Sequence, residues 1–451
     1  MSGLAGVGRA LGSTTHRAAL LSSMATAVLS LALTLPSQVL RLAERPPTLV
    51  DARDYDHLAL NLARGRGFAF CWSDPEWRAP YESAQNRKDY AMHLSLQGPC
   101  FPTARRAPGY PAALAGIYWV WGRSFQAGRL LGAVALALTG ALGSFLAVRV
   151  GSVAAAVLFA LCFLSEDELP RLVGAFMSEP TASLAVMLVL AAHVALLRNP
   201  TRQTGMLAGS SLGLLVLVRH FFSPLWALGI FAAAFGAVRS RALRPFWLAY
   251  GSTALLMLVP WGVRNCLVLD ALMPLGTQGG HVLAGKYVED EIRGAATWNS
   301  GRVARLWAKR QGKPSGYTYG KLARELRTSL AMDRDVAMVG QQAAREWLRR
   351  NWRQLPAVAL VSLRAHARGY GALGLAAVVC AFAGLAVPET RRVAAPALAV
   401  MAVTALTVAL TVEAHGRYGA PVRPVAYLAG SLGLTASMSR IFLACRRLLA
   451  R

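Results

Sequence analysis

The stretch Asp51–Phe68, DARDYDHLALNLARGRGF, is the one around which the rest of the chain is arranged. It follows a first hydrophobic segment and places three carboxylates, those of Asp51, Asp54 and Asp56, within six residues. Apolar residues recur at i, i+3, i+4 and i+7 from Tyr55, which is typical of an amphipathic helix. Two glycines, at 65 and 67, predict the end of that helix.

Two interpretations of the acids at the start of this helix stay open. A helix lying on a membrane surface could aim a carboxylate into a cleft above the bilayer. Alternatively, Asp51 is a helix N-cap and Asp54 completes an ordinary helix start.

The composition is that of a membrane protein. Of the 451 residues, 55% are hydrophobic and 16% are charged, which is too apolar for a soluble domain. The formal net charge is +26, but the basic residues lie mostly between hydrophobic blocks. Topology and anionic lipid or phosphate partners explain this charge, and the chain has no zinc-type spacing or basic DNA-binding module. Nucleic acid is therefore excluded as a partner.

Uncharged or nearly uncharged runs predict an all-α polytopic protein with about ten transmembrane helices. The first run, preceded by Arg9 and Arg17, resembles a signal sequence without a clear cleavage site, so we expect a retained signal-anchor. The turns assigned to the cytoplasm are all basic, which places both termini inside. Several runs are shorter than the ~20 residues that a bilayer requires. The ten runs are 18–35, 130–148, 150–165, 180–197, 203–218, 221–238, 246–263, 369–388, 393–412 and 424–439.

This topology predicts three parts and two long outer loops. Residues 1–263 form an N-terminal membrane module with a large outer loop at 43–128. Residues 264–368 form a second outer loop with amphipathic helices, and residues 369–451 form a three-span segment. We expect 109–122 to be a helix along the membrane surface and not a span. The protein would be integral to the inner (plasma) membrane, with these loops facing the periplasm or the cell exterior.

Two cysteines, Cys71 and Cys100, bracket part of the first long loop. A disulfide between them would be expected if the loop faces an oxidising compartment. Pairing cannot be read from sequence, so a bonded and a free pair both stay open.

Carboxylates and cations from separate segments meet at the outer membrane face. Transfer of a group from a phosphate-bearing lipid would need this combination, because a carboxylate can take the proton of an acceptor hydroxyl while a cation neutralises the leaving phosphate. Simpler roles are also open: Arg219 and Arg417 end spans and could reach head groups, and Glu179 could be a first-turn helix acid. The acidic turn at 166–168 is expected to be solvated. No histidine pair has metal-ligand spacing, so no metal is assigned, although the acids could host a divalent cation.

At these residues the chain resembles the GT-C glycosyltransferases, in the bacterial branch near aminoarabinose transferase and the protein O-mannosyltransferases. Five short motifs carry the resemblance, in the order that the family shows. They are DARDY at 51–55 with the run LALNLARGRGF, RAPGYP at 106–111, MSEP with Glu179, PWGVRN at 260–265 followed by Gly279-Gly280, and RYGAP at 417–421.

The resemblance implies a polyprenyl-phosphate-sugar donor, an inverting transfer and one acidic base in the first outer loop. By position, Asp51 is the base, Glu179 a second acid, and Arg417 a contact of the donor phosphate. The chain departs from the family at Arg219-His220, where Arg-Pro or Lys-Gly-Pro is frequent. It is also shorter than aminoarabinose transferase, which leaves the sugar open.

The sequence therefore predicts a membrane glycosyltransferase that moves a sugar from polyprenyl phosphate to a hydroxyl of an envelope glycan, lipid or protein. The alternatives are a polyprenyl-lipid flippase or secondary transporter, and a non-catalytic scaffold in an envelope-assembly complex. The predicted catalytic acids are Asp51, Asp54 and Glu179. The predicted phosphate contacts are Arg417, Arg219, Arg264, Arg106, His220 and Lys286, and the other substrate contacts are Tyr55, Tyr110, Tyr418 and His415.

Overall fold

Helices make up almost all of the regular structure in the computed structural model, which describes residues 2–287, 299–314, 316–411 and 416–449. Within that part of the chain the strands are two residues long: β1 (Ala69–Phe70) pairs antiparallel with β2 (Phe101–Pro102). The prediction of an all-α polytopic protein is confirmed.

In the part of the chain that the structure describes, seven helices are long and apolar enough to cross a membrane. One further candidate is a pair of helical segments, Leu330–Arg368 and Gly371–Ala386, bent by 111° at a break between them. The seven comprise α1 (Ser2–Thr34) with η1 (Leu35–Leu40), α6 (Phe125–Val150), α9 (Glu179–Arg198), η3 (His220–Phe222) with α11 (Ser223–Arg239), α12 (Arg244–Leu256) with α13 (Val259–Leu269), α21 (Pro388–Thr411), and α22 (Gly416–Gly419) with η6 (Ala420–Val422) and α23 (Arg423–Leu449).

The predicted count of about ten spans is not confirmed, since three apolar runs fold differently from the others. α7 (Val153–Leu164) has 12 residues, or about 18 Å, against a hydrocarbon core of ~30 Å. α10 (Arg202–Val218) has 17 residues and is also short. The third run forms α20 (Gly371–Ala383) with η5 (Gly384–Ala386), which is one arm of the bent pair.

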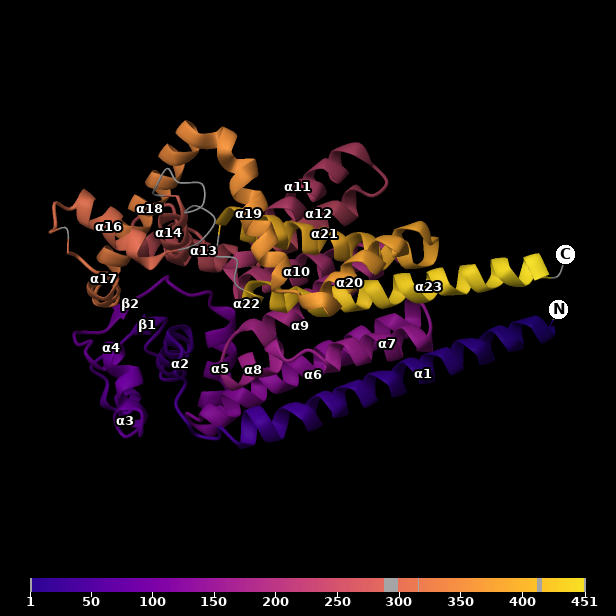
Figure 1. Ribbon diagram of the computed structural model, residues 1–451, viewed down its shortest axis with the longest axis horizontal. Coiled ribbons are helices and arrows are strands. Elements are labelled where there is room, and N and C mark those ends of the chain that lie inside the picture. The colour runs from indigo at the N-terminus through magenta and orange to yellow at the C-terminus, as the bar shows by residue number, and fades with distance from the viewer. Residues whose placement is uncertain (1, 288–298, 315, 412–415, 450–451) are drawn as a thin grey trace.

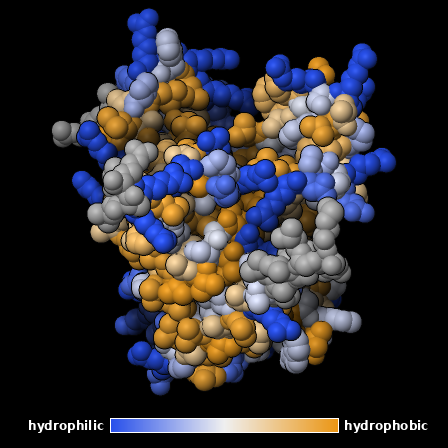
Figure 2. Space-filling model, turned by 90° about the vertical axis from the view of Figure 1, so that its right-hand side faces the viewer, coloured by the Kyte–Doolittle hydropathy of each residue, from blue (hydrophilic) through white to orange (hydrophobic). Residues whose placement is uncertain are grey.

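The two long loops gather at one end of the molecule, and both termini lie at the other (Figure 1). The first loop holds α2 (Val50–Ala63), α3 (Pro75–Glu82), η2 (Arg87–Tyr90), α4 (Ala91–Leu94) and α5 (Gly109–Trp121). The second holds α14 (Gln278–Lys286), α16 (Ser300–Arg310), α17 (Tyr319–Glu325), α18 (Leu330–Asn351), η4 (Trp352–Gln354) and α19 (Leu355–Arg368). Figure 2 looks onto the end with the termini, where hydrophilic side chains project around a hydrophobic surface.

The acidic helix α2 forms where the sequence predicts it, but Asp51 is not its cap. The N-cap residue is Leu49, which has an extended backbone and no side-chain hydrogen bond to the helix. The N-cap interpretation of Asp51 is therefore wrong, and the residue lies inside the first turn. Gly65 and Gly67 follow the helix with φ of +70° and +77°, which non-glycine residues rarely adopt.

Cys71 and Cys100 are joined in a disulfide next to the β1–β2 pair. This bond ties the two ends of the segment that contains α3 and α4. The backbone N–H of Cys71 donates to Nε2 of His57 at 3.0 Å, which fastens the same segment to α2.

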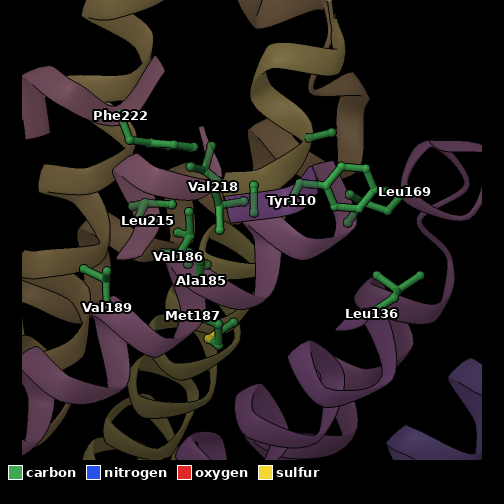
Figure 3. Close-up of a cluster of buried hydrophobic side chains, with 14 of the residues drawn as sticks. Tyr110, Leu136, Leu169, Ala185, Val186, Met187, Val189, Leu215, Val218 and Phe222 are labelled. Carbon is green, nitrogen blue, oxygen red and sulfur yellow. The ribbon is translucent and has the colours of Figure 1, made fainter. Parts of the chain in front are cut away.

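α9 connects the loop end to the apolar core. Figure 3 shows the cluster around it, in which Val186, Leu215 and Val218 are almost wholly buried. α10 and α12 approach so closely that a Cβ added at Gly209 would lie 2.1 Å from the carbonyl oxygen of Tyr250. The start of α9, which carries Glu179, lies beside α8 (Glu168–Gly174) and meets the first loop at Ser178, whose Oγ is 3.3 Å from the Tyr55 hydroxyl.

One predicted surface acid is buried. Glu166 accepts hydrogen bonds from Arg423 at 2.6 Å and from the Tyr427 hydroxyl at 2.7 Å. The expectation of a solvated turn is wrong for this residue, because α23 packs against the turn and supplies both partners. Its neighbour Asp167 is exposed, as expected.

Candidate active site

Asp51 lies between two arginines at the loop end of the molecule. Its Oδ1 accepts from Nη2 of Arg106 at 2.5 Å, and its Oδ2 accepts from Nη2 of Arg417 at 3.0 Å. The side chain keeps 22% of its surface exposed, so a substrate can reach it. Burial alone would raise the pKa of Asp51, but the two arginines outweigh that effect and hold it at about 2. The carboxylate is therefore ionised at neutral pH.

Arg417 also approaches a second acid. Its Nε lies 4.0 Å from Oε1 of Glu179, and Arg219 forms a closer ion pair with the same oxygen at 2.7 Å. Glu179 is in the first turn of α9 and its side chain is fully buried. Among the described residues, its Oε2 has no hydrogen-bond partner.

Tyr55 and Tyr418 lie beside the cluster that Asp51, Glu179 and their arginines form. The hydroxyl of Tyr55 lies 3.3 Å from Oγ of Ser178, which also accepts from Nη1 of Arg219 at 3.3 Å. The guanidinium groups of Arg219 and Arg417 lie 5.8 and 5.3 Å from the centre of the Tyr418 ring. These contacts hold the two cations on the side of the cluster where α9, α10 and α22 meet.

Asp54 is completely buried behind Asp51. Its Oδ2 accepts from Nε and Nη2 of Arg106 at 3.1 and 2.7 Å, and from Nη2 of Arg327 at 3.2 Å. Nε2 of His93 lies 3.4 Å from its Oδ1. Burial opposes ionisation of Asp54, yet Arg327 and Arg106 hold its pKa well below the ordinary value. The carboxylate has no surface for a substrate and instead fixes Arg106.

The charges in the cluster do not cancel. Burial lowers the pKa of His93 to about 4, so this ring is neutral at pH 7. Three carboxylates then face four arginines, which leaves a net charge of +1 before any substrate binds. The carboxylates are Asp51, Asp54 and Glu179, and the arginines are Arg106, Arg219, Arg327 and Arg417.

The third acid of α2, Asp56, belongs to the folded frame and not to the cluster. Its oxygens accept from Arg123, Tyr81, Tyr118 and Trp77, and its side chain is fully buried. It holds α2 against α3 and α5.

Two residues that were predicted to contact phosphate, Arg264 and Lys286, instead form hydrogen bonds with other parts of the chain. Arg264 donates to the carbonyl oxygens of Thr103 at 2.5 Å and Phe68 at 3.0 Å, so it ties the first loop to α13. Lys286 donates to the carbonyl oxygen of Ala409 at 2.5 Å and lies 3.4 Å from Oγ of Ser362. These bonds engage both side chains in holding separate segments of the chain together.

The remaining predicted contacts differ in position. Tyr110 is buried and packs edge-on against Tyr55, with ring centres 5.1 Å apart. His220 follows Arg219 with its ring 6.4 Å from that of Trp261, and neither ring nitrogen has a hydrogen-bond partner among the described residues. His415 lies outside the described residues.

Sequence reasoning missed three residues of the cluster. Ser178 stands beside Glu179 in the MSEP motif, and its hydroxyl could have been noticed there. Arg327 and His93 had no distinguishing signal, because each is one of many polar residues in a long loop. Among the described residues, no three His, Cys, Asp or Glu side chains gather as ligands for a metal ion.

Comparisons with known proteins give one distant similarity. No family model matches the chain, and no curated protein matches its sequence. Among solved structures, ArnT from Cupriavidus metallidurans bound to undecaprenyl phosphate is 19% identical over 92% of this chain and 79% of that chain, with a TM-score of 0.37. Its apo state gives 18% identity over 92% and 78%, with the same TM-score. At this distance the likeness places no individual residue of this chain.

Proposed function

We propose that this protein is an integral-membrane glycosyltransferase that moves a sugar from a polyprenyl-phosphate donor to an acceptor hydroxyl. The observation that carries the proposal is one partly exposed carboxylate, Asp51, held between two arginines in a cluster of net positive charge. Such a cluster can accept a proton and receive a phosphate at adjacent points.

Asp51 is the general base in this proposal. The acceptor hydroxyl approaches its exposed edge, and the proton passes to the carboxylate as the hydroxyl oxygen bonds to the anomeric carbon of the sugar. A pKa of about 2 keeps the group ionised but makes it a weak base while both arginines contact it. When the donor phosphate competes for Arg417, Asp51 loses part of that stabilisation and becomes more basic at the moment it is needed.

Arg417 and Arg219 are the proposed phosphate contacts. The bond between the anomeric carbon and the phosphate oxygen breaks, and polyprenyl phosphate leaves with one more negative charge. Both guanidinium groups can shift toward that charge, because Arg417 keeps 30% of its surface exposed and Arg219 keeps 11%. A single displacement inverts the anomeric carbon.

The two other acids have positioning roles in this proposal. Asp54 cannot reach a substrate, and it holds Arg106 against Asp51. Glu179 holds Arg219 at 2.7 Å and lies within 4.0 Å of Arg417. It therefore sets the distance between the two phosphate contacts. Tyr55 and Tyr418 frame the cluster and take no part in proton transfer.

The orientation is part of the proposal. The cluster lies at the end opposite the termini (Figure 1), so termini in the cytoplasm would put the reaction on the periplasmic or exterior face. The acceptor would be a glycan, lipid or protein at that face.

The test uses the full chain, purified in detergent, with a panel of radiolabelled polyprenyl-phosphate sugars and a membrane extract as the acceptor source. Release of polyprenyl phosphate together with label in an acceptor is the expected result. If no donor is cleaved while proteoliposomes translocate a labelled polyprenyl lipid, the protein is a flippase and the proposal is wrong.

A further inference from the structure

A basic groove lies far from the acidic cluster, at the end of the molecule that carries the termini. It has a volume of about 450 Å³ between the start of α10 and the first two turns of α12. The turn that joins α11 to α12 points toward this end in Figure 1. Arg202, Arg241 and Arg244 line its mouth. The proposed reaction uses none of these residues.

The three arginines have no partners of their own within the described part of the chain. All three are exposed, and none makes a side-chain hydrogen bond or an ion pair with a described residue. Arginine presents a planar fork of donors that matches phosphate oxygens. The first turn of α12 adds the positive end of a helix dipole at the same place. The mouth of the groove therefore suits a phosphate anion.

The rest of the groove is mostly apolar and runs along a span. Leu248, Ala249 and Ser252 follow Arg244 at i+4, i+5 and i+8, so they share one face of α12. This face extends about 12 Å from the arginines in the direction of the bilayer interior. Leu248 has 53% of its surface exposed. A free phosphate would leave this wall uncovered, whereas a lipid with a phosphate head group would cover it.

We propose that this groove binds one anionic phospholipid, with its phosphate between the three arginines and an acyl chain along Leu248 and Ala249. Basic pockets between membrane helices bind anionic head groups in this manner. The inference is independent of the proposed sugar transfer, since the two sites lie at opposite ends of the molecule.

Native mass spectrometry of the full chain, exchanged into detergent with phosphatidylglycerol, tests the proposal. Wild-type protein is expected to retain one phosphatidylglycerol molecule in preference to phosphatidylcholine. The triple variant R202Q/R241Q/R244Q should bind it one to two orders of magnitude more weakly, given about a tenfold effect or less for each arginine near a membrane surface. Each single substitution should give a smaller loss in the same direction, which keeps the test valid if the triple variant folds poorly.

The matched control is R392Q/R446Q/R447Q. It removes the same charge from exposed arginines that the topology puts at the same end but that do not line the groove. Its affinity for phosphatidylglycerol should match that of wild type. An equal loss in this control would show that only the general surface charge matters and would overturn the site. Inorganic phosphate binding as tightly as phosphatidylglycerol, or phosphatidylcholine being retained equally, would also overturn it.

Discussion

Replacing Asp51 by asparagine removes the proposed base with little change in shape. The amide of the new side chain keeps one oxygen, which can still accept a hydrogen bond from Arg106 or Arg417. It cannot hold a proton from the acceptor. General-base catalysis contributes roughly 10²–10⁴-fold in rate, so we expect D51N to lower kcat by that factor.

The loss of stability in D51N should be much smaller than the loss of turnover. The pKa of Asp51 falls from 3.8 to about 2 in the folded protein, which corresponds to about 2 kcal/mol of favourable interaction at neutral pH. Arg106 keeps Asp54 at 2.7 Å, and Arg417 keeps Glu179 at 4.0 Å, so neither arginine is left without an acid nearby. The variant should fold.

A measurement of donor affinity distinguishes the loss of a catalytic base in D51N from a general structural defect. Removal of Asp51 frees Arg417 from its 3.0 Å ion pair, so the affinity for a polyprenyl-phosphate sugar should be unchanged or higher. The assay compares single-turnover release of polyprenyl phosphate with equilibrium donor binding in wild type and D51N. The matched control is D167N, because Asp167 is an exposed acid outside the cluster. Turnover in D51N within about threefold of D167N would refute the assignment of Asp51 as the base, since general-base catalysis supplies far more than that.

Four further predictions concern the residues around Asp51. R417Q should weaken polyprenyl-phosphate binding by roughly 10-fold or more, whereas R264Q should lower the melting temperature without that effect; equal donor affinity in the two variants would contradict this. D54N leaves Arg106 and Arg327 partly uncompensated in a buried site and should cost about 3–5 kcal/mol of unfolding free energy, measured by denaturant titration. C71S/C100S opens a loop of 29 residues and should cost about 3–4 kcal/mol, read as a lower melting temperature that reductant reproduces in wild type. Because the depressed pKa of Asp51 is about 2, its ionised form is lost only as pH falls through that value. The profile of kcat/KM, which reports the free enzyme, should therefore show no acid limb from Asp51 between about pH 4 and 7. The acid limb of kcat should lie at a higher pH than that of kcat/KM, because bound donor phosphate competes for Arg417 and weakens the stabilisation of ionised Asp51.

Much of the local structure could be predicted from the sequence. The period of apolar residues from Tyr55 and the glycines after α2 define that helix, because both signals depend on neighbours within one or two turns. The span count could not be obtained in the same way. An apolar run shows only that a segment avoids water, and not how long the helix it forms will be. α7 and α10 end after 12 and 17 residues.

The meeting of Asp51, Arg106, Glu179, Arg219 and Arg417 follows from motif order and topology, which put all five at one end. The residues that contact the buried acid Asp54 could not be inferred from the sequence. Arg327 contacts Asp54 across 273 positions of sequence, and its loop contains many other basic residues that look the same in composition. Only the fold selects one of them.

In the proposed reaction, the contact between Arg327 and Asp54 decides which acid of α2 a substrate can reach. Asp51 and Asp54 are three residues apart, so they lie on one face of the helix, and helix periodicity alone does not separate them. Arg327 and His93 cover Asp54, while Asp51 remains open on the side of Arg417. Arg106 contacts both acids, at 2.5 Å and 2.7 Å. In the proposed reaction, a proton on Asp51 leaves Arg106 paired with Asp54 and frees Arg417 to move toward the leaving phosphate. Asp54 thus keeps a carboxylate against Arg106 when Asp51 loses its charge, and the added positive charge is left at Arg417, where the leaving phosphate gains a negative one.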